Sequence, residues 1–524
     1  MKTTITAITA FLCITGVTYA QDYKLSWGTV AKASSSDAVY LPLGYDSGNY
    51  YTIKVDNGDG TLMKVDQDQN LADQTPLVIT TKKFEADLAF LRKSKVVLLN
   101  SDYDSGDKAT TVTASTYSMD GKATGTKLKK VATFTVEKNT EHADLLYYFS
   151  SDSSMLAIVM DHDMPNKDDA KVSIAVIKTD DMTELWHTSA SLPYDDDDFA
   201  TLSGAVDAAG NFLMLSVIRG GEGKRLSKYS TRMFTFSAKD QKFTDRELKI
   251  EGKYISSAFI QFAAGNQLMI TGFYNDLKEN GKNEGIEGAF MCTTDASTLE
   301  NLDLRVMKMD PIAKAAVAPS SGFAKFIGTD ELNGYFIRNI NLDADGSGYV
   351  IAEQRYMVET DNGNYRSRTY YFNHLLVYHF NSNKDIEWIT GIPKAQVSSI
   401  TTPKIGIGPV AFWFFSASQV RMAYKYNSFT AVKKDGVIYI MYNDHRDNGD
   451  ARTYKDVKIM SNKNKANAVI VAVDEKGKWE KTPLFIGKDV DVILETSSSY
   501  PIFGKGFTIS AERGKDLQFG KVEL

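Results

Sequence analysis

The stretch VYHFNSNKDIEWITGIPKAQ, residues 377–396, decides how the rest of the chain is interpreted. Apolar residues alternate with polar ones on both sides of a turn rich in Asn, Lys and Asp, and the second run carries Trp388. Alternation with a period of two, interrupted by turn-forming residues, is typical of an antiparallel β-hairpin. His379 and Glu387 lie close to Trp388 in the sequence and raise the alternative of an active site. Copies of the stretch elsewhere in the chain distinguish the two interpretations.

The same pattern recurs along the chain. AVIKTDDMTELW (175–186) and VAVDEKGKW (471–479) again end in tryptophan, and MFTFSAKDQKF (233–243) and FMCTTDASTL (290–299) have Phe or Leu in its place. Each hairpin follows another hairpin, and the clearest four-strand unit reads DLLYYFSS, MLAIVMD, VSIAVIKTD and ELWHTSASL within residues 144–192. A hairpin that is repeated in this way is a structural unit, so His379 is interpreted as a strand residue and not as part of a site.

Eight such units can be counted. Their first strands begin near Asp37, Phe84, Ala143, Ala200, Tyr254, Leu332, Tyr426 and Ser497. Three successive units are spaced by about 55 residues, close to the repeat length of propeller blades. We predict an all-β chain that forms a single β-propeller of eight four-stranded blades over residues 21–524. Seven blades are the alternative if the poorly periodic unit that contains VDNGDGTLMKV (55–65) is not a blade.

The last unit supplies only three strands, whereas a surplus strand, YKLSWGTV (23–30), precedes the first unit. Its Trp27 corresponds to the tryptophans of other fourth strands. We predict that this N-terminal strand pairs with the C-terminal blade and closes the ring, which removes an exposed sheet edge. Insertions are expected around 311–328, with one short helix, and around 397–425.

The first 20 residues, MKTTITAITAFLCITGVTYA, have the plan of a cleavable secretory signal. Lys2 precedes an apolar stretch, and small residues precede the expected cleavage after Ala20. The apolar stretch is shorter than the roughly 20 residues of a membrane anchor, so no transmembrane segment is expected after cleavage. The protein is predicted to be periplasmic, outer-membrane-associated or secreted. Cys292 would then be the single cysteine, and it is interpreted as a buried core thiol.

The composition and a family resemblance limit the functional classes. The formal net charge is −6 and no run of Lys or Arg stands out, which argues against nucleic acid as a partner. The segments GYVIAEQRY, EWITGIPKAQ and VIYIMYNDHRDN, within residues 341–484, resemble repeats of secreted bacterial β-propeller proteins of uncharacterised function. The resemblance implies the propeller fold and carries over no catalytic residues.

The connections after the second strands are the first candidate for function. They read SDYDSGD (101–107), DHDMPNKDD (161–169), YNDLKENGKNEG (274–285) and NDHRDNGD (443–450). Corresponding connections lie on one face of a propeller, so we expect an oxygen-rich rim there, with Asp161, Asp163 and Asp444 as binding residues. Asp102, Asp104 and Asp107 are candidate calcium ligands, because Ca²⁺ prefers carboxylate and carbonyl oxygens, although no Glu closes the motif. Ordinary surface turns favour the same residues, which is the alternative explanation.

The insertion TTPKIGIGPVAFWFFSASQV (401–420) is the second candidate. Trp413, Phe414 and Phe415 could present aromatic rings to a sugar or protein partner, or could extend the core. No metal-spaced histidines and no G-x-S-x-G occur, and no cofactor is required. The sequence favours a noncatalytic binding or scaffold propeller for a protein or glycan. A hydrolase or lyase of extracellular polysaccharide, using Asp161, Asp444 or Glu353, is the alternative.

Overall fold

The computed structural model describes most of the chain after the N-terminal segment. The described residues are 23–32, 38–56, 58–77, 86–124, 128–164, 168–220, 229–248, 250, 252–263, 267–277, 285–299, 302–318, 332, 334–363, 365–403, 417–486, 492–513 and 516–524. The predicted signal peptide, residues 1–20, therefore lies outside the described residues.

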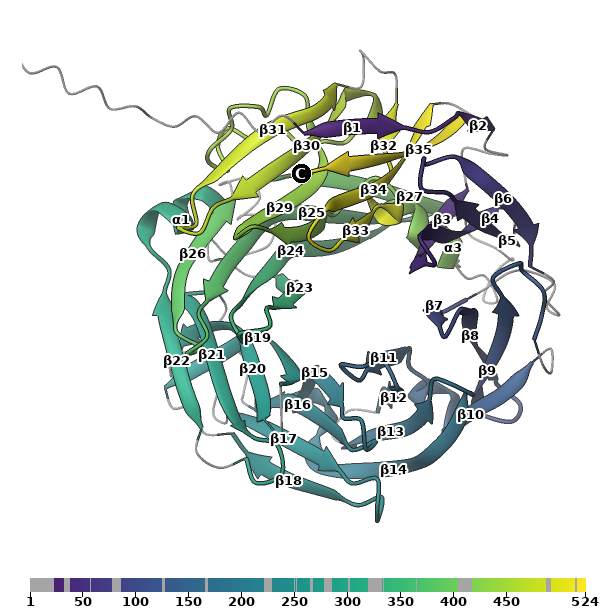
Figure 1. Ribbon diagram of the computed structural model, residues 1–524. Coiled ribbons are helices and arrows are strands. Elements are labelled where there is room, and N and C mark those ends of the chain that lie inside the picture. Colours follow the sequence, from purple (N-terminus) through teal and green to yellow (C-terminus); the bar gives the residue numbers. More distant parts are fainter. Residues whose placement is uncertain are drawn as a thin grey trace, which may run out of the picture.

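Eight antiparallel sheets follow one another around a ring, as Figure 1 shows. Blades 1 to 4 consist of β3 (Val39–Asp46), β4 (Asn49–Asp56), β5 (Asp59–Val65), β6 (Leu71–Pro76); β7 (Leu88–Arg92), β8 (Lys95–Asp104), β9 (Ala109–Ser118), β10 (Lys129–Thr135); β11 (Leu145–Phe149), β12 (Met155–Asp161), β13 (Asp169–Lys178), β14 (Thr183–Asp195); and β15 (Phe199–Val206), β16 (Phe212–Ile218), β17 (Ser230–Phe236), β18 (Phe243–Glu247). Blades 5 to 8 consist of β19 (Lys253–Phe262), β20 (Gln267–Asp276), β21 (Gly288–Asp295), β22 (Asp303–Lys308); β23 (Tyr335–Leu342), β24 (Gly348–Asp361), β25 (Tyr365–Phe380), β26 (Ile386–Ile392); β28 (Thr430–Lys434), β29 (Val437–His445), β30 (Ala466–Val473), β31 (Trp479–Ile486); and β32 (Ile493–Leu494) with β33 (Tyr500–Ile502), β34 (Gly506–Arg513), β35 (Asp516–Glu523), β1 (Lys24–Trp27) with β2 (Ala31–Lys32).

The prediction of an eight-bladed propeller is confirmed, and the seven-bladed alternative is wrong. The poorly periodic unit forms a complete first blade, in which β4 and β5 pair from Tyr50 with Val65 to Asp56 with Asp59. Blade 8 has six strand segments because its first and fourth strands are each divided in two, and blade 6 has a fifth strand, β27 (Gln396–Pro403).

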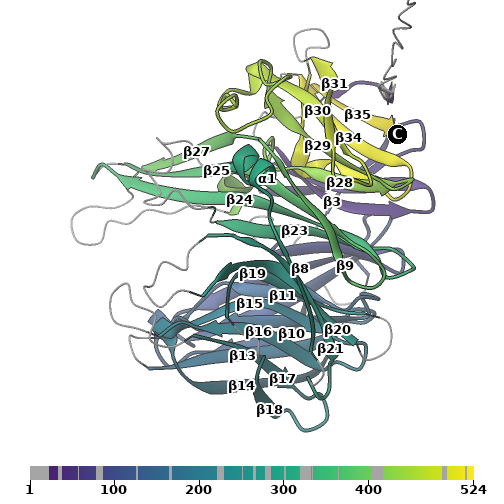
Figure 2. The same cartoon turned by 90° about the vertical axis from the view of Figure 1, so that its left-hand side faces the viewer.

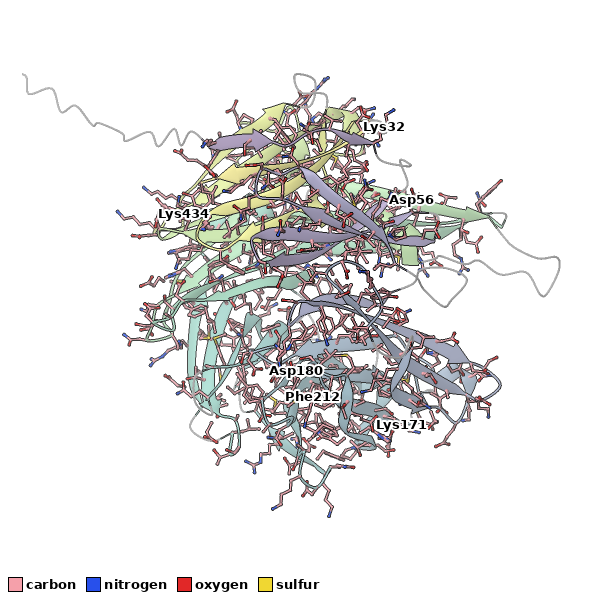
Figure 3. All side chains as sticks on the ribbon, turned by 45° about the vertical axis from the view of Figure 1, so that its right-hand side comes forward. Lys32, Asp56, Lys171, Asp180, Phe212 and Lys434 are labelled. Carbon is pink, nitrogen blue, oxygen red and sulfur yellow. The ribbon has the colours of Figure 1, made fainter. Side chains whose placement is uncertain are left out.

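The hydrophobic core lies between neighbouring blades, and the alternation of each strand explains this position. In β12, Leu156, Ile158 and Met160 pack in a cluster with residues of blade 2. Ala157 and Val159, which point to the opposite face, pack in a second cluster with residues of blade 4, among them Phe212. Side chains two residues apart share one face of a sheet, so a middle strand that is buried on both faces joins two clusters. Figure 3 shows Phe212 among the strands of the lower blades, whereas Lys32 and Lys434 lie at the outside of the molecule.

The tryptophans of the fourth strands connect neighbouring blades. The indole Nε1 of Trp186 donates a hydrogen bond to the carbonyl oxygen of Gly210 in blade 4, at 2.9 Å. Trp388 of blade 6 donates to the carbonyl oxygen of Glu475 in blade 7 at 2.8 Å. In the opposite direction, Trp479 of blade 7 donates to the carbonyl oxygen of Gly391 in β26 at 3.1 Å. Trp27 packs edge-on against Phe485, with 5.7 Å between ring centroids. Trp388 therefore has the repeated structural role that the sequence predicts.

The N-terminal strand closes the ring. β1 pairs antiparallel with β35, from Lys24 opposite Glu523 to Trp27 opposite Gly520, and β2 continues along the same strand. In Figure 1 the purple N-terminal strand accordingly lies beside the yellow C-terminal strands. The predicted closure is confirmed: β35 is covered by a strand from the other end of the chain.

Short helices occupy the connections. The described α-helices are α1 (Pro311–Val317) and α3 (Ala417–Tyr424), and the 3-10 turns are η1 (Asn139–Glu141), η2 (Asp196–Asp198), η4 (Lys463–Lys465) and η5 (Thr496–Ser498). Asp310 caps α1, which is the helix expected within 311–328, and Val317 packs where Gly391 leaves room on β26. α3 was not expected in the second insertion. None of the helices in the described ranges is long and apolar enough to span a membrane.

Candidate functional site

The connections after the second strands lie on the same face of the ring as the connections between blades, because the four strands of each blade are antiparallel. In the first of these connections, Asp102, Asp104 and Asp107 are exposed. The Asp104 carboxylate accepts hydrogen bonds from the backbone N–H groups of Gly106 and Asp107, which lower its pKa. Within the described part of the chain, no three His, Cys, Asp or Glu side chains are grouped so that they could hold a metal ion. Calcium binding by this hairpin stays a prediction.

Asp161 is the last residue of β12, and Asp163 lies in the connection that follows it on this face. Burial raises the pKa of Asp161 to about 6, against the opposing effect of a hydrogen bond with Thr201. Asp163 is exposed and lies with Asn139, His142 and Asp144 at a shallow, open hollow. The two acids are thus near each other in the chain but differ in environment, because Asp161 is partly buried and Asp163 is exposed.

Asp444 does not belong to an exposed rim, and this corrects its predicted position. Its side chain is 1% exposed and accepts from the Nζ of Lys481 and the Nδ2 of Asn448, both at 2.7 Å. Glu353, the acid considered for catalysis, is fully buried and contacts Lys394 and Arg355, each at 2.7 Å. Although burial opposes it, these two cations lower the pKa of Glu353. Both carboxylates therefore have structural partners that occupy their oxygens.

Glu353 and Lys394 belong to a buried polar network where blades 6, 7, 8 and 1 meet, since Lys394 donates to Gln396, which donates to the carbonyl oxygen of Asn443 in blade 7. The ammonium of Lys425, directly after α3, lies 2.6 Å from Glu512 and 3.1 Å from Glu495 in blade 8. It also donates to the carbonyl oxygen of Ala38 at the start of blade 1. Burial, together with the neighbouring Glu512, raises the pKa of Glu495. Lys425, Glu495 and Glu512 are at most 5% exposed, and their ion pairs anchor the end of the second insertion across the ring closure.

His379 of residues 377–396 contacts neighbouring residues of its own blade. His379 stacks on Trp388 with 5.8 Å between ring centroids, and its Nδ1 lies 2.9 Å from a carboxylate oxygen of Glu387. Cys292 is fully buried, and burial raises the pKa of its thiol to about 12. The interpretation of His379 as a strand residue and of Cys292 as a core thiol agrees with these positions.

A pocket of about 360 Å³ lies among the first strands of blades 4, 5 and 6, and we call it the inner pocket. Its wall is formed by Thr201, Leu202, Arg219, Tyr254, Ser256, Ser257, Ala258, Gly285, Ile286, Gly334, Tyr335, Phe336 and Tyr356. Most of these residues begin a first strand, follow a second strand or precede a third one. The pocket therefore opens on the face that carries the connections between blades.

Aromatic side chains and one arginine give the inner pocket its chemistry. The guanidinium of Arg219 lies 5.3 Å from the centroid of the Tyr254 ring, which packs at a tilt against Tyr229 with 5.0 Å between ring centroids. Among the described residues, the buried Nε of Arg219 has no hydrogen-bond partner. Gly334 has a positive φ of 68°, and a Cβ there would lie within 3.0 Å of the Tyr356 ring, so glycine allows this tyrosine to reach the wall.

The sequence did not single out the inner pocket. Its residues come from three blades and from separate strand ends, so no local motif connects them. A signal would have been the aromatic residues near the start of two first strands, Tyr254 in β19 and Tyr335 with Phe336 in β23, which lie on the same face of the ring. Trp413, Phe414 and Phe415, the aromatic candidates of the second insertion, lie outside the described residues, and their role stays a prediction.

Comparisons with known proteins do not identify the function. No protein-family model matches the chain, and no curated protein matches it significantly. Similar solved structures include the Dos1 propeller, with 10% identity, 95% of each chain covered and a TM-score of 0.41. The WD40 domain of SCAP from fission yeast has 8% identity, covers 96% of each chain and has a TM-score of 0.35. The polysaccharide lyase Uly1 has 10% identity, covers 87% of this chain and 94% of its own, and has a TM-score of 0.33.

Proposed function

We propose that this protein is an exported, noncatalytic β-propeller that holds a protein or glycan partner of the cell envelope at the inner pocket. The composition of the pocket wall carries the proposal. It offers four aromatic rings, one guanidinium and several hydroxyl groups, and its described residues include no carboxylate, imidazole or amine. Concave sites lined by aromatic residues with a few convergent polar groups are typical of ligand binding. Glycoside hydrolysis usually needs two carboxyl groups that face each other across the bond.

Export is part of the proposal and rests on the N-terminal sequence. The lysine, the short apolar stretch and the small residues before Gln21 match a cleavable signal. If the signal is cleaved as predicted, the mature chain begins at Gln21. Its ligand would then be found outside the cytoplasm, which favours envelope proteins and polysaccharides as the partners to examine.

A polysaccharide hydrolase or lyase stays the second candidate because of Asp161. The pKa of this carboxyl group is raised to about 6, a value suited to a general acid, and its hydrogen-bond partner Thr201 lines the inner pocket. The remaining acids of the earlier hypothesis, Asp444 and Glu353, are occupied by Lys481, Lys394 and Arg355. Asp161 alone does not supply the pair of groups that the reaction requires.

The test combines capture from native envelope extract with a glycan array, using the purified full chain and three variants. Ser257→Phe fills the inner pocket, and Arg219→Ala removes its cation. Ser151→Phe makes the same type of change at an exposed turn between β11 and β12, on the opposite face. We expect the two pocket variants to bind the captured ligand at least about tenfold more weakly and the control to bind normally. Binding that survives both pocket variants, or turnover of a bound polysaccharide, would overturn the proposal.

A further inference from the structure

Blade 6 carries an arm that extends beyond the ring. β24 and β25 are the longest neighbouring pair, with 14 and 16 residues, and β27 pairs with the outer half of β25 from Phe372 to Tyr365. Figure 2 shows these three strands projecting from one side of the molecule. Because side chains alternate along each strand, the arm has two faces of different composition.

One face of the arm packs against α3 at its inner end and carries charged residues farther out. The rings of Phe372 and Tyr370 contact Tyr424 of α3, at 4.8 and 5.9 Å between centroids. Farther out on the same face, Arg368 pairs with Glu359 at 2.8 Å. These contacts explain why this side of the arm packs against its own chain.

The opposite face, which we call the hydroxyl face, consists of three rungs across the three strands. The rungs are Tyr356, Tyr371 and Val397; Val358, Thr369 and Ser399; and Thr360, Ser367 and Thr401. No member is charged, and each side chain is exposed or half-buried. Hydroxyl groups meet within two rungs, at 2.9 Å between Thr369 and Ser399 and at 2.7 Å between Ser367 and Thr401.

The hydroxyl face continues the wall of the inner pocket, because Tyr356 belongs to both. The rungs are about 7 Å apart along the strands, so the face extends the pocket as an uncharged track. Tyrosine offers an apolar ring with a hydroxyl group, and Ser and Thr hydroxyls both donate and accept hydrogen bonds. Sugar rings have the matching chemistry, with apolar C–H faces and hydroxyl groups at their edges.

We propose that the hydroxyl face binds an uncharged polysaccharide chain that continues outward from the inner pocket. This inference rests on the proposed function and makes it more specific: the glycan partner is neutral and long enough to occupy pocket and arm together. The absence of charge on the three rungs argues against an acidic polysaccharide, because an anionic chain would gain no cation there. A chain too short to pass beyond Tyr356 would occupy the pocket alone.

The test measures the affinity of the full chain for neutral oligosaccharides from β-glucan, xylan and mannan, in length series from disaccharide to octasaccharide. Ser399→Glu places a charge on the hydroxyl face, and Thr369→Val removes one hydroxyl group with little change of shape. Met357→Glu places the same charge on the other face of the arm, where Met357 is 52% exposed. For wild type and Met357→Glu, we expect affinity to rise with chain length. For Ser399→Glu, we expect the octasaccharide to lose about tenfold and the disaccharide to be unchanged.

The possible failures are distinguishable. If no neutral oligosaccharide binds, or if the rise with length persists in Ser399→Glu and Thr369→Val, the hydroxyl face is not a glycan track. The proposed function would still stand if Ser257→Phe abolished binding of a captured partner in the same preparation. Loss of octasaccharide binding in Met357→Glu would also overturn the inference, because it would show that charge anywhere on the arm has the same effect.

Discussion

Asp161 is a partly buried acid whose ionisation opposes folding. Burial raises its pKa from 3.8 to about 6 in the native chain. At pH values below the ordinary pKa the carboxyl group is protonated in both states and has no effect. As the pH rises to about 6, the unfolded chain loses this proton first, so stability decreases through this window and the penalty is complete above it. We predict that Asp161→Asn stabilises the protein at neutral pH by on the order of 2 kcal/mol and has little effect near pH 4.

Urea unfolding of wild type and Asp161→Asn at the two pH values measures this difference. Asp163→Asn, at the exposed acid two residues away, is the matched control and should change neither value. Equal effects of Asp161→Asn at both pH values would contradict the prediction. Activity toward polysaccharide, abolished by Asp161→Asn, would instead support the hydrolase alternative.

The environment of single polar residues was harder to predict from the sequence than the fold was. Asp444 lies in a loop-like run of Asn, Asp and Gly, which favours an exposed turn. Its partner Lys481 is 37 residues away and lies on β31, whereas Asp444 lies on β29, so no local sequence pattern indicates the buried ion pair. The same holds for Glu353 and Lys394, 41 residues apart. Burial of single polar residues depends on tertiary pairing, which alternation and turn composition do not contain.

At the scale of elements, the fourth-strand tryptophan connects one blade to the next. The indole of Trp186 is buried, and its Nε1 donates to the carbonyl oxygen of Gly210. We predict that Trp186→Phe lowers the free energy of unfolding by about 2 kcal/mol, because the bond is lost, the carbonyl is left without this donor, and the smaller ring leaves space. Denaturant unfolding followed by intrinsic fluorescence and circular dichroism measures the change.

The control for this prediction is Ser191→Ala, an exposed position of the same strand. It tests whether any change in β14 weakens the blade. A loss in Trp186→Phe no larger than that of Ser191→Ala would show that the indole does not connect blades 3 and 4 energetically.

Strands could be predicted from the sequence more fully than the insertions. Period-two alternation and turn residues are local signals, and they located the first strand of every blade. The arm was missed because its third strand, β27, comes from an insertion and pairs with the long extension of β25. α3 was missed because the apolar and aromatic run before it suggested an irregular cap. Both errors concern segments whose structure depends on packing against blade 6 and not on their own periodicity.

At the scale of the whole molecule, ring closure was predictable because it is a matter of counting. The last unit lacks a fourth strand, and a surplus strand precedes the first unit. Pairing the surplus strand with the last unit completes all eight blades, and the register of β1 on β35 confirms this pairing. The functional surface was not predictable in this way. The inner pocket collects residues from blades 4, 5 and 6, and the hydroxyl face continues it, so both arise only after the blades are placed around the ring.

The closure also makes the ends of the chain interdependent. A chain that begins at Ala38 lacks β1 and β2, and this exposes the edge of β35 and removes Trp27 from its contact with Phe485. We predict a clear decrease in melting temperature and concentration-dependent association, since an unpaired edge strand binds other strands.

A second chain carries residues 23–32 after Leu524, joined by a short Asn-Gly turn, because Lys24 lies opposite Glu523 and a hairpin can connect them. This rearranged chain should recover the monomeric state and most of the melting temperature, as measured by light scattering and thermal unfolding. A truncated chain that stays monomeric with unchanged melting temperature, or a rearranged chain that behaves like the truncated one, would show that the N-terminal strand does not stabilise the ring.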